Sequence, residues 1–436
     1  MQTLKFRRIS RYRWPLVITA TLVMTAVFSL SPLMEVTRLN GPATASLRTP
    51  LAYDMFAPVS NVLDALTLLS PAQYWATFAL CAVTFFGVWT YRCTWSRAGF
   101  SAARLLRAAL GFMGGVVAVL GIMLVATRPM ASLSLADRDL IVVDFHSHTE
   151  ASHDGRPGFD PERNREWHSS SGFDAAYVTD HMTFDGTLTG AARNPARSGD
   201  ATVLLPGVEL RDGDQHPILI GVDPRRMRIT SPDWQGAAVE ADGGPVPPML
   251  LLSMPGNILR IPMSETTGPV RLVGIEAADG SPRGMAQAAR DQDAILALAA
   301  NLHLAVVSAS DNHGWGRTAP AWSVLRIPGW RDMTPSELDI AIRRTIMTRG
   351  TQAIEVIARR TAGPPQNTVE AAVGGIAVAL VMLRTMSLPD RFSWVVWSWG
   401  LCLMSLRNAR RNGYRRRVRA RKRAETELMP AVDAAA

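Results

Sequence analysis

The sequence predicts an α/β domain of the barrel type that is flanked on both sides by membrane-spanning helices. Long apolar runs lie near both ends of the 436-residue chain, whereas residues 128–364 form a more polar, globular segment between them. Within that segment, four short apolar runs typical of strands end in histidine, aspartate or glutamate. Active sites of barrels lie at that end of the strands. With 47% hydrophobic residues, the chain is too apolar to be disordered.

Three apolar runs in the N-terminal third are each long enough to be a membrane span: Trp14–Met34, Gln73–Tyr91 and Ala108–Thr127. The first has 21 uncharged residues, which as an uncleaved helix cover about 30 Å of hydrocarbon. Two shorter runs near the C-terminus, Ala371–Leu383 and Phe392–Leu406, predict one or two further spans. We therefore expect a membrane region at 1–127, a globular domain at 128–364 and a C-terminal region at 365–436.

The basic residues are concentrated in two tails and not in a groove. Residues 1–13 carry +5 and residues 407–423 carry +10, so the rest of a chain of net charge +9 carries −6. Such tails beside apolar runs are typical of cytoplasmic anchoring charges, and we expect membrane lipids but no nucleic acid as partners. The arginine-rich loop 92–107 and the arginine-poor loop 35–72 predict a bacterial inner-membrane protein with a periplasmic domain. The basic C-terminal tail fits this orientation if only one C-terminal run crosses the membrane.

All eight histidines lie between residues 146 and 313, whereas Cys81, Cys93 and Cys402 lie in or beside apolar runs. A cysteine-based zinc site in the globular domain is therefore excluded. The first cluster follows the predicted strand 140–143, where Asp144, His146 and His148 are two residues apart and so share one face. Two imidazoles on one face can chelate a cation, and Asp144 can orient a ring from behind.

Three further strand-like runs end in the same way. The run 175–178 leads into Asp180 and His181, and the run 304–309 leads into Asp311 and His313. Glu209 lies inside the apolar run 203–210, where a carboxylate is costly unless it is paired or binds a cation. His216 opens another strand-like run, while we interpret His168 and His303 as capping or surface residues. Imidazoles and carboxylates without a thiolate favour Zn, Mn or Fe in a hydrolytic site.

These motifs together resemble those of the PHP (polymerase and histidinol phosphatase) superfamily. The residues that carry the resemblance are, in order, His146-Ser147-His148-Thr149, Thr179-Asp180-His181, Gly207-Val208-Glu209 and Ser310-Asp311-Asn312-His313. The resemblance covers about residues 140–360 and implies a distorted (β/α)7 TIM-like barrel with two or three divalent metal ions at the strand ends. It implies three ligand sets, which are His146, His148, Glu209 and Asp311 for one ion, Asp154 (or His153), His181 and His313 for a second, and Glu209, His216 and a further histidine for a third.

The sequence departs from the family's pattern at two places. His153 and Asp154 compete for one ligand position, because the first motif is one residue longer than the common form. The chain has no histidine between residues 216 and 303, where the family often supplies the remaining ligand, and Met254-Pro255 occupies that place. Two ions are therefore an alternative to three.

The resemblance implies a membrane-anchored, metal-dependent phosphoesterase. A water that bridges two cations loses a proton near neutral pH, and the hydroxide could attack the phosphorus of a small-molecule or lipid-headgroup phosphoester. Asp144 and Asp180 would hold ligands in place without binding the metal. Of the arginines near the motifs, Arg211 is the first choice to bind phosphate oxygens. The alternative is a catalytically inactive PHP-like barrel that senses a metal or ligand at the membrane.

Overall fold

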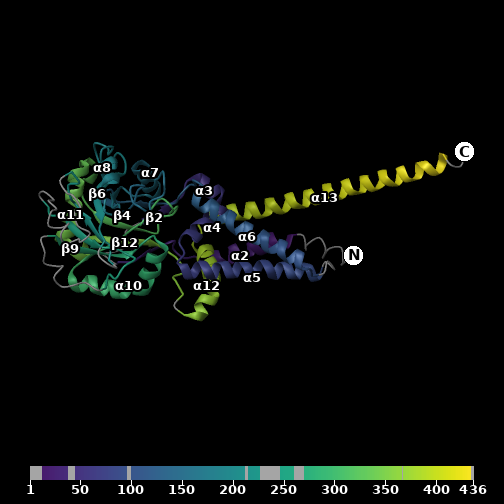
Figure 1. Ribbon diagram of the computed structural model, residues 1–436, viewed down its shortest axis with the longest axis horizontal. Helices are drawn as coiled ribbons and strands as arrows, with labels where there is room; N and C mark the ends of the chain where they lie inside the picture. Colours follow the sequence, from purple (N-terminus) through teal and green to yellow (C-terminus); the bar gives the residue numbers. More distant parts are fainter. Residues whose placement is uncertain are drawn as a thin grey trace. The chain divides into compact units, whose positions relative to one another are not determined.

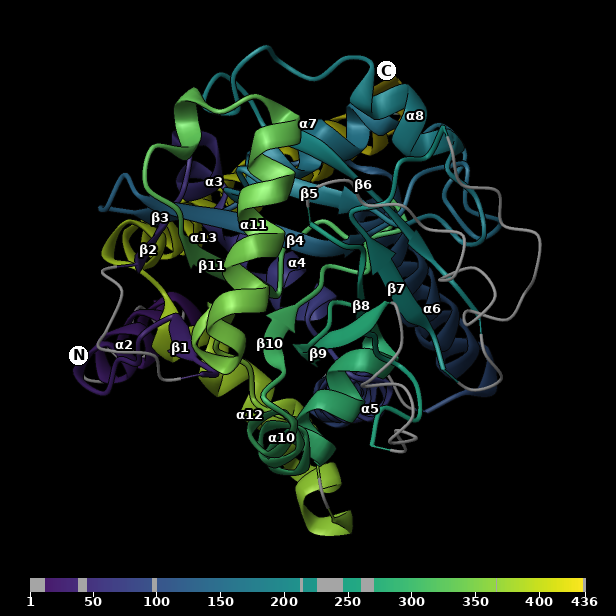
Figure 2. The ribbon, with the colours of Figure 1, turned by 90° about the vertical axis from the view of Figure 1, so that its left-hand side faces the viewer.

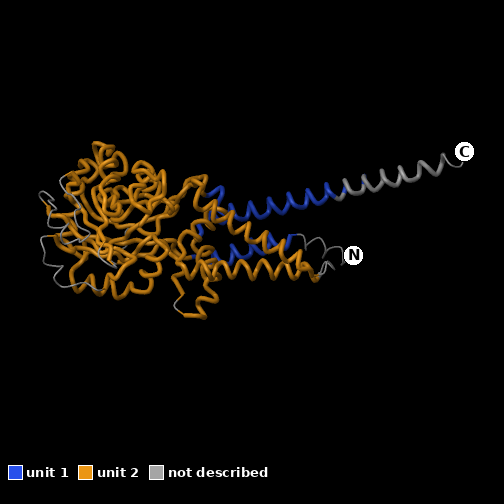
Figure 3. Tube along the Cα trace, in the orientation of Figure 1, with its two compact units in different colours: residues 1–29, 54–58, 386–436 blue, residues 30–53, 59–385 orange. Residues whose placement is uncertain are grey.

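The computed structural model describes residues 12–37, 45–95, 100–211, 215–225, 246–259, 270–365 and 367–433, with fewer side chains described beyond residue 412. The chain forms two compact units (Figure 3). The smaller unit consists of Met1–Ser29, Asp54–Pro58 and Met386–Ala436, and the larger one of Leu30–Tyr53 and Val59–Thr385.

The smaller unit contains helix α2 (Arg13–Val27) and the 46-residue helix α13 (Leu388–Asp433). The buried guanidinium of Arg391 in α13 donates hydrogen bonds to the Leu22 carbonyl oxygen (2.8 Å) and to Thr25 Oγ1 (2.9 Å), both in α2. The helix α2 covers only the first part of the predicted span 14–34 (Figure 1), since it ends at Val27 and residues 33–35 form a strand. Its 15 residues cover only about 22 Å.

Three helices of the larger unit are long and apolar enough to cross a membrane: α5 (Pro71–Trp95), α6 (Ala102–Val125) and α12 (Thr368–Thr385). They include most of the predicted runs 73–91, 108–127 and 371–383, whereas the run 392–406 lies inside α13. No side chain of α6 is buried. The helix α12 packs closely on α5 at Gly375, where a Cβ atom would lie 2.9 Å from the Ala76 carbonyl oxygen.

The larger unit is built around a ten-stranded sheet, in which neighbouring strands are hydrogen-bonded in the order β1-β12-β11-β4-β5-β6-β7-β8-β9-β10. In the same order these are Leu33–Glu35, Ile354–Arg359, Ala321–Arg326, Leu140–Ser147, Ala175–Val178, Val203–Glu209, Pro217–Ile220, Met249–Leu252, Arg271–Ala278 and Ala305–Ser308. A separate pair consists of β2 (Ala45–Arg48) and β3 (Ser132–Leu135).

The sheet curls, so that the chain after β10 lies against the end of β4 (Figure 2). Ser147 and Asn312 form a parallel bridge, and the Asp311 N–H donates to the His146 carbonyl oxygen (3.0 Å). Deeper in the curl, the hydroxyls of Ser308 and Ser323 are hydrogen-bonded at 2.9 Å. The carboxyl ends of β4 and β10 are thereby adjacent, which brings together motifs about 165 residues apart in the sequence.

Helices alternate with strands in only part of the sheet. The helix α7 (Pro161–Ser171) connects β4 to β5, α8 (Asp185–Ala191) connects β5 to β6, and α10 (Pro282–Leu302) connects β9 to β10. The strands β4, β5 and β6 run parallel to one another, and so do β8, β9 and β10. Between these two groups, β7 runs antiparallel to both β6 and β8. The fold is mixed α/β with a curled sheet, and the described residues do not show the regular (β/α)7 alternation.

The segment before residue 128 contributes to the globular part, so the predicted boundary at 127 does not separate the two regions. The strand β1 extends the sheet at β12, and β2 pairs with β3. Asp64 of helix α4 (Ala57–Thr67) is buried and is ion-paired with both Arg128 and Arg359. Its oxygens also accept hydrogen bonds from Tyr53 and Thr318, each at 2.9 Å.

The strands form where apolar runs are buried, and the helices begin and end at residues that cap them. Seven of the eight residues of β4 are buried, as its apolar run Leu140–Val143 predicts. The helix α7 begins at Asp160, whose side chain accepts a hydrogen bond from the Arg163 N–H, and it ends at Gly172 with φ of +86°. His303, at φ of +56°, ends α10 and is exposed, in agreement with its interpretation as a capping or surface residue. The helix α11 (Pro335–Arg349) begins with a capping box.

Candidate metal centre

The end of β4 and the chain after β10 bring the first set of predicted ligands together. The Nε2 atoms of His146 and His148, both buried, lie 2.9 Å apart. Glu209 Oε2, at the end of β6, lies 3.1 Å and 3.2 Å from these two nitrogens. Asp311 Oδ1 lies 3.6 Å and 3.4 Å from them. The four side chains therefore point their donor atoms at one common position.

The second set lies beside the first and is closer to solvent. Asp154 lies between two histidines, with Oδ2 at 3.4 Å from His181 Nε2 and Oδ1 at 3.2 Å from His313 Nε2. The His313 ring stacks on His148 with the ring centroids 3.9 Å apart. His153 has a side chain that is 74% exposed and lies 3.9 Å from Asp154. This geometry favours Asp154 over His153 as the ligand that joins His181 and His313.

Glu209 also connects the second set to the third. Its Oε1 lies 2.7 Å from His216 Nδ1, while its Oε2 lies 3.2 Å from His181 Nδ1. The third set, which the sequence leaves with an unidentified histidine, can therefore be completed by His181. Nitrogen atoms of four histidines thus lie within 3.2 Å of one carboxylate.

The two predicted supporting aspartates are buried behind the ligands. Asp180 accepts hydrogen bonds from the Thr149 N–H (2.6 Å) and from Thr149 Oγ1 (2.8 Å), which fixes the chain directly after His148. Asp144 accepts hydrogen bonds from the N–H groups of His146 and Ser310, and so joins β4 to the chain after β10.

His168 was predicted to be a capping or surface residue, and that prediction is wrong. It is fully buried, and its Nε2 lies 2.8 Å from Asp144 Oδ2. Its Nδ1 lies 2.8 Å from the Asn164 carbonyl oxygen, one turn earlier in α7. The sequence around His168 is polar, so only the packing of α7 against β4 shows that this histidine lies inside.

Sequence reasoning also missed a buried carboxylate behind His146. Glu276 in β9 is fully buried, and its Oε1 lies 3.0 Å from His146 Nδ1. Its Oε2 accepts a hydrogen bond from the Met254 N–H (2.7 Å). Asp279, which is also buried, lies close enough to share a cation with His146 and Glu276. Glu276 lies inside an apolar strand, so the argument that identified Glu209 applies equally to it.

The charges at the centre depend on one another. Burial alone would raise the pKa of Glu209, but the charge of His146 and hydrogen bonds from three histidines hold that pKa well below its ordinary value. Burial would lower the pKa of His146, but Glu209 and Glu276 raise it. Burial lowers the pKa of His181 to about 4 and also lowers that of His313. The surroundings thus favour the anionic form of Glu209 and the neutral forms of the two outer imidazoles, whereas His146 favours its protonated form and must lose that proton when an ion binds.

The donor set fits divalent cations. Two atoms bound to one zinc ion at 2.0–2.2 Å lie about 3 to 3.6 Å apart. The distances between donors in the first set, from 2.9 Å to 3.6 Å, are of this size. Five overlapping groups of histidines and carboxylates in the described residues could each hold an ion, and Glu209 belongs to two of them.

Of the arginines near the motifs, two lie at the surface and two lie nearer the centre. Arg193 and Arg211 are exposed, so no contact in the described residues supports Arg211 as a phosphate ligand. Arg156 and Arg317 are half-buried, and Arg156 lies over the Trp315 ring at 5.4 Å from its centroid. Burial and the charges of three neighbouring arginines, Arg156 among them, lower the pKa of Arg317.

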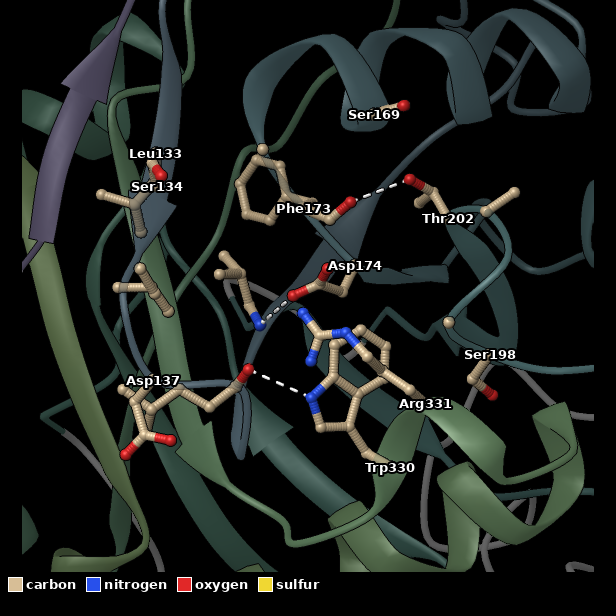
Figure 4. A pocket seen from close by; sticks show the side chains of 16 residues that line it. Leu133, Ser134, Asp137, Ser169, Phe173, Asp174, Ser198, Thr202, Trp330 and Arg331 are labelled. Atoms are coloured by element: carbon tan, nitrogen blue, oxygen red, sulfur yellow. Dashed lines mark hydrogen bonds between the residues drawn. The ribbon is translucent and has the colours of Figure 1, made fainter.

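Two cavities lie at opposite ends of the parallel strands. A cavity of about 450 Å³ is lined by Asp154, Asp311 and His313 of the candidate centre. Another, of about 340 Å³, lies at the starts of β4, β5 and β6 and is lined by Asp174, Thr202 and Arg331 (Figure 4). Because barrel active sites lie at the carboxyl ends of strands, the first cavity is the one that belongs to the candidate centre.

No protein-family model matches the sequence, and neither does any curated protein sequence. Solved structures do show similarity. PsfC from Pseudomonas syringae is 18% identical, with 57% of this chain and 99% of PsfC covered, at a TM-score of 0.36. A two-domain protein from Bacteroides vulgatus, described as containing a predicted PHP-like metal-dependent phosphoesterase, is 16% identical, with 54% and 71% covered, at a TM-score of 0.36.

The lesion-specific endonuclease PfuEndoQ from Pyrococcus furiosus is 14% identical, with 49% of this chain and 57% of the endonuclease covered, at a TM-score of 0.35. An Endonuclease Q complex with a 27-mer duplex is also similar, at 13% identity and a TM-score of 0.33. Nothing in the described residues supports the expectation that nucleic acid is not a partner. A chain described as containing a predicted PHP-like metal-dependent phosphoesterase and one described as a metal-dependent phosphoesterase are thus among the structures that this chain resembles, as its motifs predict.

Proposed function

We propose that this protein is a membrane-anchored, metal-dependent hydrolase of phosphoesters with a multinuclear metal site. The observation that supports the proposal best is the convergence of eight side chains: His146, His148, Asp154, His181, Glu209, His216, Asp311 and His313. They come from the ends of β4, β5, β6 and β10 and from the start of β7. A structural role alone does not require four imidazoles around one buried carboxylate, with a fifth stacked on one of them.

The bound ions would be two or three of Zn, Mn or Fe, and they would lower the pKa of a coordinated water so that it is a nucleophile near neutral pH. The protein's own residues position this chemistry. Ionised Glu209 would join the inner and outer ligand sets, since its two oxygens face different histidines. Asp154, whose side chain is 45% exposed, lies at the entrance, where the substrate phosphate would arrive.

Variants of the inner ligand set test this proposal. In His146→Ala and Asp311→Asn we expect hydrolysis of an aryl phosphate to fall by about 100-fold or more, because each change removes a donor from the same position. The bound metal, measured by mass spectrometry on the full chain in detergent, should fall in parallel. His303→Asn is the matched control, because His303 is exposed at the other end of β10 and asparagine accepts its positive φ.

The result also separates the two candidate functions. Full activity in either ligand variant would contradict the assignment of the centre. Stoichiometric metal without hydrolysis of any phosphoester would instead support an inactive barrel that senses a metal or ligand. The unfolding temperature of each variant shows whether the loss is one of folding.

We further propose that the barrel faces the periplasm from the bacterial inner membrane. The support is the distribution of basic residues. They are concentrated in residues 1–13 and again around the connection between α5 and α6, whereas the segment 35–72 has few. A reporter that works only outside the cytoplasm should be active when fused after Thr127 and silent after Arg97. The opposite pattern would place the barrel in the cytoplasm. A third fusion after Ala436 reports the side on which the basic tail ends.

A further inference from the structure

The cavity beside the candidate metal centre has two chemically different walls. One wall is polar and belongs to the centre, with Asp154, Asp311 and His313. The opposite wall comes from the helices that are apolar enough to cross a membrane, with Tyr74 from the first turn of α5 and Met123 and Leu124 from the last turn of α6. All of these residues belong to the larger unit. The cavity therefore joins a metal-binding centre to the ends of apolar helices.

The apolar wall continues along the outside of α6. Leu124 lines the cavity and is 44% exposed, and Leu120 and Val117 are exposed one and two turns earlier in the same helix. An exposed apolar helix of this length has no favourable environment in water, whereas a bilayer covers it. An apolar chain that lies against α6 in the bilayer can therefore reach the cavity without crossing water.

Aromatic side chains mark the depth at which the cavity opens. Trp75 follows Tyr74 in the first turn of α5, and its side chain is 74% exposed. Phe112 of α6 contacts Phe78, Phe85 and Phe86 of α5, so the two helices lie side by side and the start of α5 is level with the end of α6. Tryptophan and tyrosine at helix ends are typical of the interface between hydrocarbon and head groups.

Cationic side chains lie next to the polar part of the cavity. Arg156 covers the ring of Trp315, which lines the cavity, and Arg317 follows two residues later. In the described part of the chain, neither guanidinium forms an ion pair with a carboxylate. Such cations attract an anionic head group to this end of the cavity.

From these four observations we propose that the substrate is a membrane lipid phosphoester, which enters the cavity from the bilayer with its phosphate at the metal centre and its apolar chains along the end of α6. This inference rests on the proposed function and adds the class of substrate. In the reaction, water provides the oxygen of a new P–O bond while one P–O ester bond breaks. The proton from water goes to the leaving oxygen, which departs as an alcohol.

Filling the apolar wall tests the inference. Leu124→Trp should lower kcat/KM about tenfold or more for phosphatidic acid or phosphatidylglycerol in nanodiscs, because the larger side chain occupies the space for the apolar chains. Hydrolysis of soluble 4-nitrophenyl phosphate should change less than about twofold, because the metal centre is untouched. Leu110→Trp, the same change at an exposed position away from the cavity, is the matched control.

Binding provides a readout that does not depend on turnover. A radiolabelled phosphonate analogue of phosphatidic acid, which cannot be hydrolysed, should bind the wild type and Leu110→Trp equally and Leu124→Trp more weakly. Hydrolysis of 4-nitrophenyl phosphate without hydrolysis of either lipid would overturn the lipid assignment and leave the phosphoesterase proposal standing. An equal loss on soluble and lipid substrates in Leu124→Trp would also overturn it. If no phosphoester is hydrolysed at all, both proposals fail.

Discussion

His146 lies between two buried carboxylates that contact different nitrogens of its ring. Glu276 lies at Nδ1 and Glu209 at Nε2. A ring that donates its Nδ1 proton to Glu276 has a free lone pair on Nε2, which is the nitrogen that points toward His148 and Asp311. We therefore expect Glu276 to be a positioning residue, which would fix the orientation and the tautomer of His146 without binding the ion that His146 would share with Glu209.

Glu276→Gln tests this role. The amide can still accept or donate one hydrogen bond, but it removes the negative charge behind the ring, so we expect metal affinity to fall by about 10- to 100-fold. Titration of the metal-free full chain with zinc measures the affinity directly. Glu35→Gln, at an exposed position of β1, is the matched control. Unchanged affinity in Glu276→Gln would show that the contact is only structural.

The position of a single residue could be predicted from the sequence where a candidate ligand directly follows a strand. His146, His148, Asp311 and His313 follow apolar runs directly, so the pattern alone places them at strand ends. His168 could not be placed in this way, because its burial depends on how α7 packs on Asp144. Nor does the sequence decide between His153 and Asp154, since that choice depends on which side chain the loop turns toward His313.

At the scale of elements, the two ends of the parallel strands differ in what they bury. The carboxyl ends hold the histidines, whereas the amino ends surround the cavity that contains Asp174 (Figure 4). Asp174 Oδ2 accepts a hydrogen bond from the Val142 N–H at 2.9 Å, which joins the start of β5 to β4. Burial nevertheless raises the pKa of Asp174 to about 6, because the hydrogen bond and the charge of Arg331 do not fully offset the loss of water.

Asp174→Asn should therefore stabilise the protein in a pH-dependent way. A carboxyl whose pKa is higher in the folded state than in the unfolded state costs stability once it is ionised, so the cost grows from about pH 4 to pH 7. We expect a gain of about 1–2 kcal/mol for the variant at pH 8 and almost none at pH 4, from urea unfolding at both values. Asparagine keeps an oxygen that accepts from Val142.

Asp137, which lines the same cavity, provides a control of opposite sign. A hydrogen bond from the Asp139 N–H and an ion pair with Arg326 lower the pKa of Asp137. Its ionised form thus favours folding, and this contribution is lost as the pH falls through the lowered pKa. Asp137→Asn should lose stability at pH 8, where Asp174→Asn gains it. The same sign for both variants would contradict the assignment of Asp174.

Elements could be predicted where their pattern is long or strongly apolar. The strands β4 and β10 and the helices α5 and α6 correspond to apolar runs that are visible in the sequence. The strand β1 is only three residues long and has no periodicity of its own, so the predicted span 14–34 includes two of its three residues. It is a strand because β12 offers a free edge to it. Pairing with β12, and not the local sequence, therefore makes residues 33–35 a strand.

At the scale of the whole molecule, the barrel and the apolar helices of the larger unit are tied together by buried charge. Asp64, just before α5, pairs with Arg128, just after α6, and with Arg359 in β12. The same carboxylate accepts a hydrogen bond from Thr318, in the loop that follows Asp311 and His313. Breaking a buried pair by removing one partner typically costs 3–5 kcal/mol. One carboxylate thus contacts the segments that flank α5 and α6 and the loop that carries the candidate ligands Asp311 and His313.

The domain bounds that the sequence predicts rest on composition alone. Composition separates apolar from polar segments, and it places the change at about residue 128. Contacts between distant segments do not follow composition, and they bring residues 33–35, 45–48 and 64 into the globular part. A fragment that begins at residue 128 would lack β1, β2 and Asp64, so the experiments above use the full chain.

The pairing of β1 with β12 also determines when β1 can join the sheet during synthesis. Thr37, directly after β1, accepts a hydrogen bond from the Val356 N–H of β12, which is 319 residues later in the chain. A ribosome that adds about 5–20 residues per second needs roughly 15–60 s to make that interval. Both α5 and α6 are synthesised within this interval, whereas β12 is made only at its end. The strand β1 can therefore join the sheet only after the last strand in the sequence has been made.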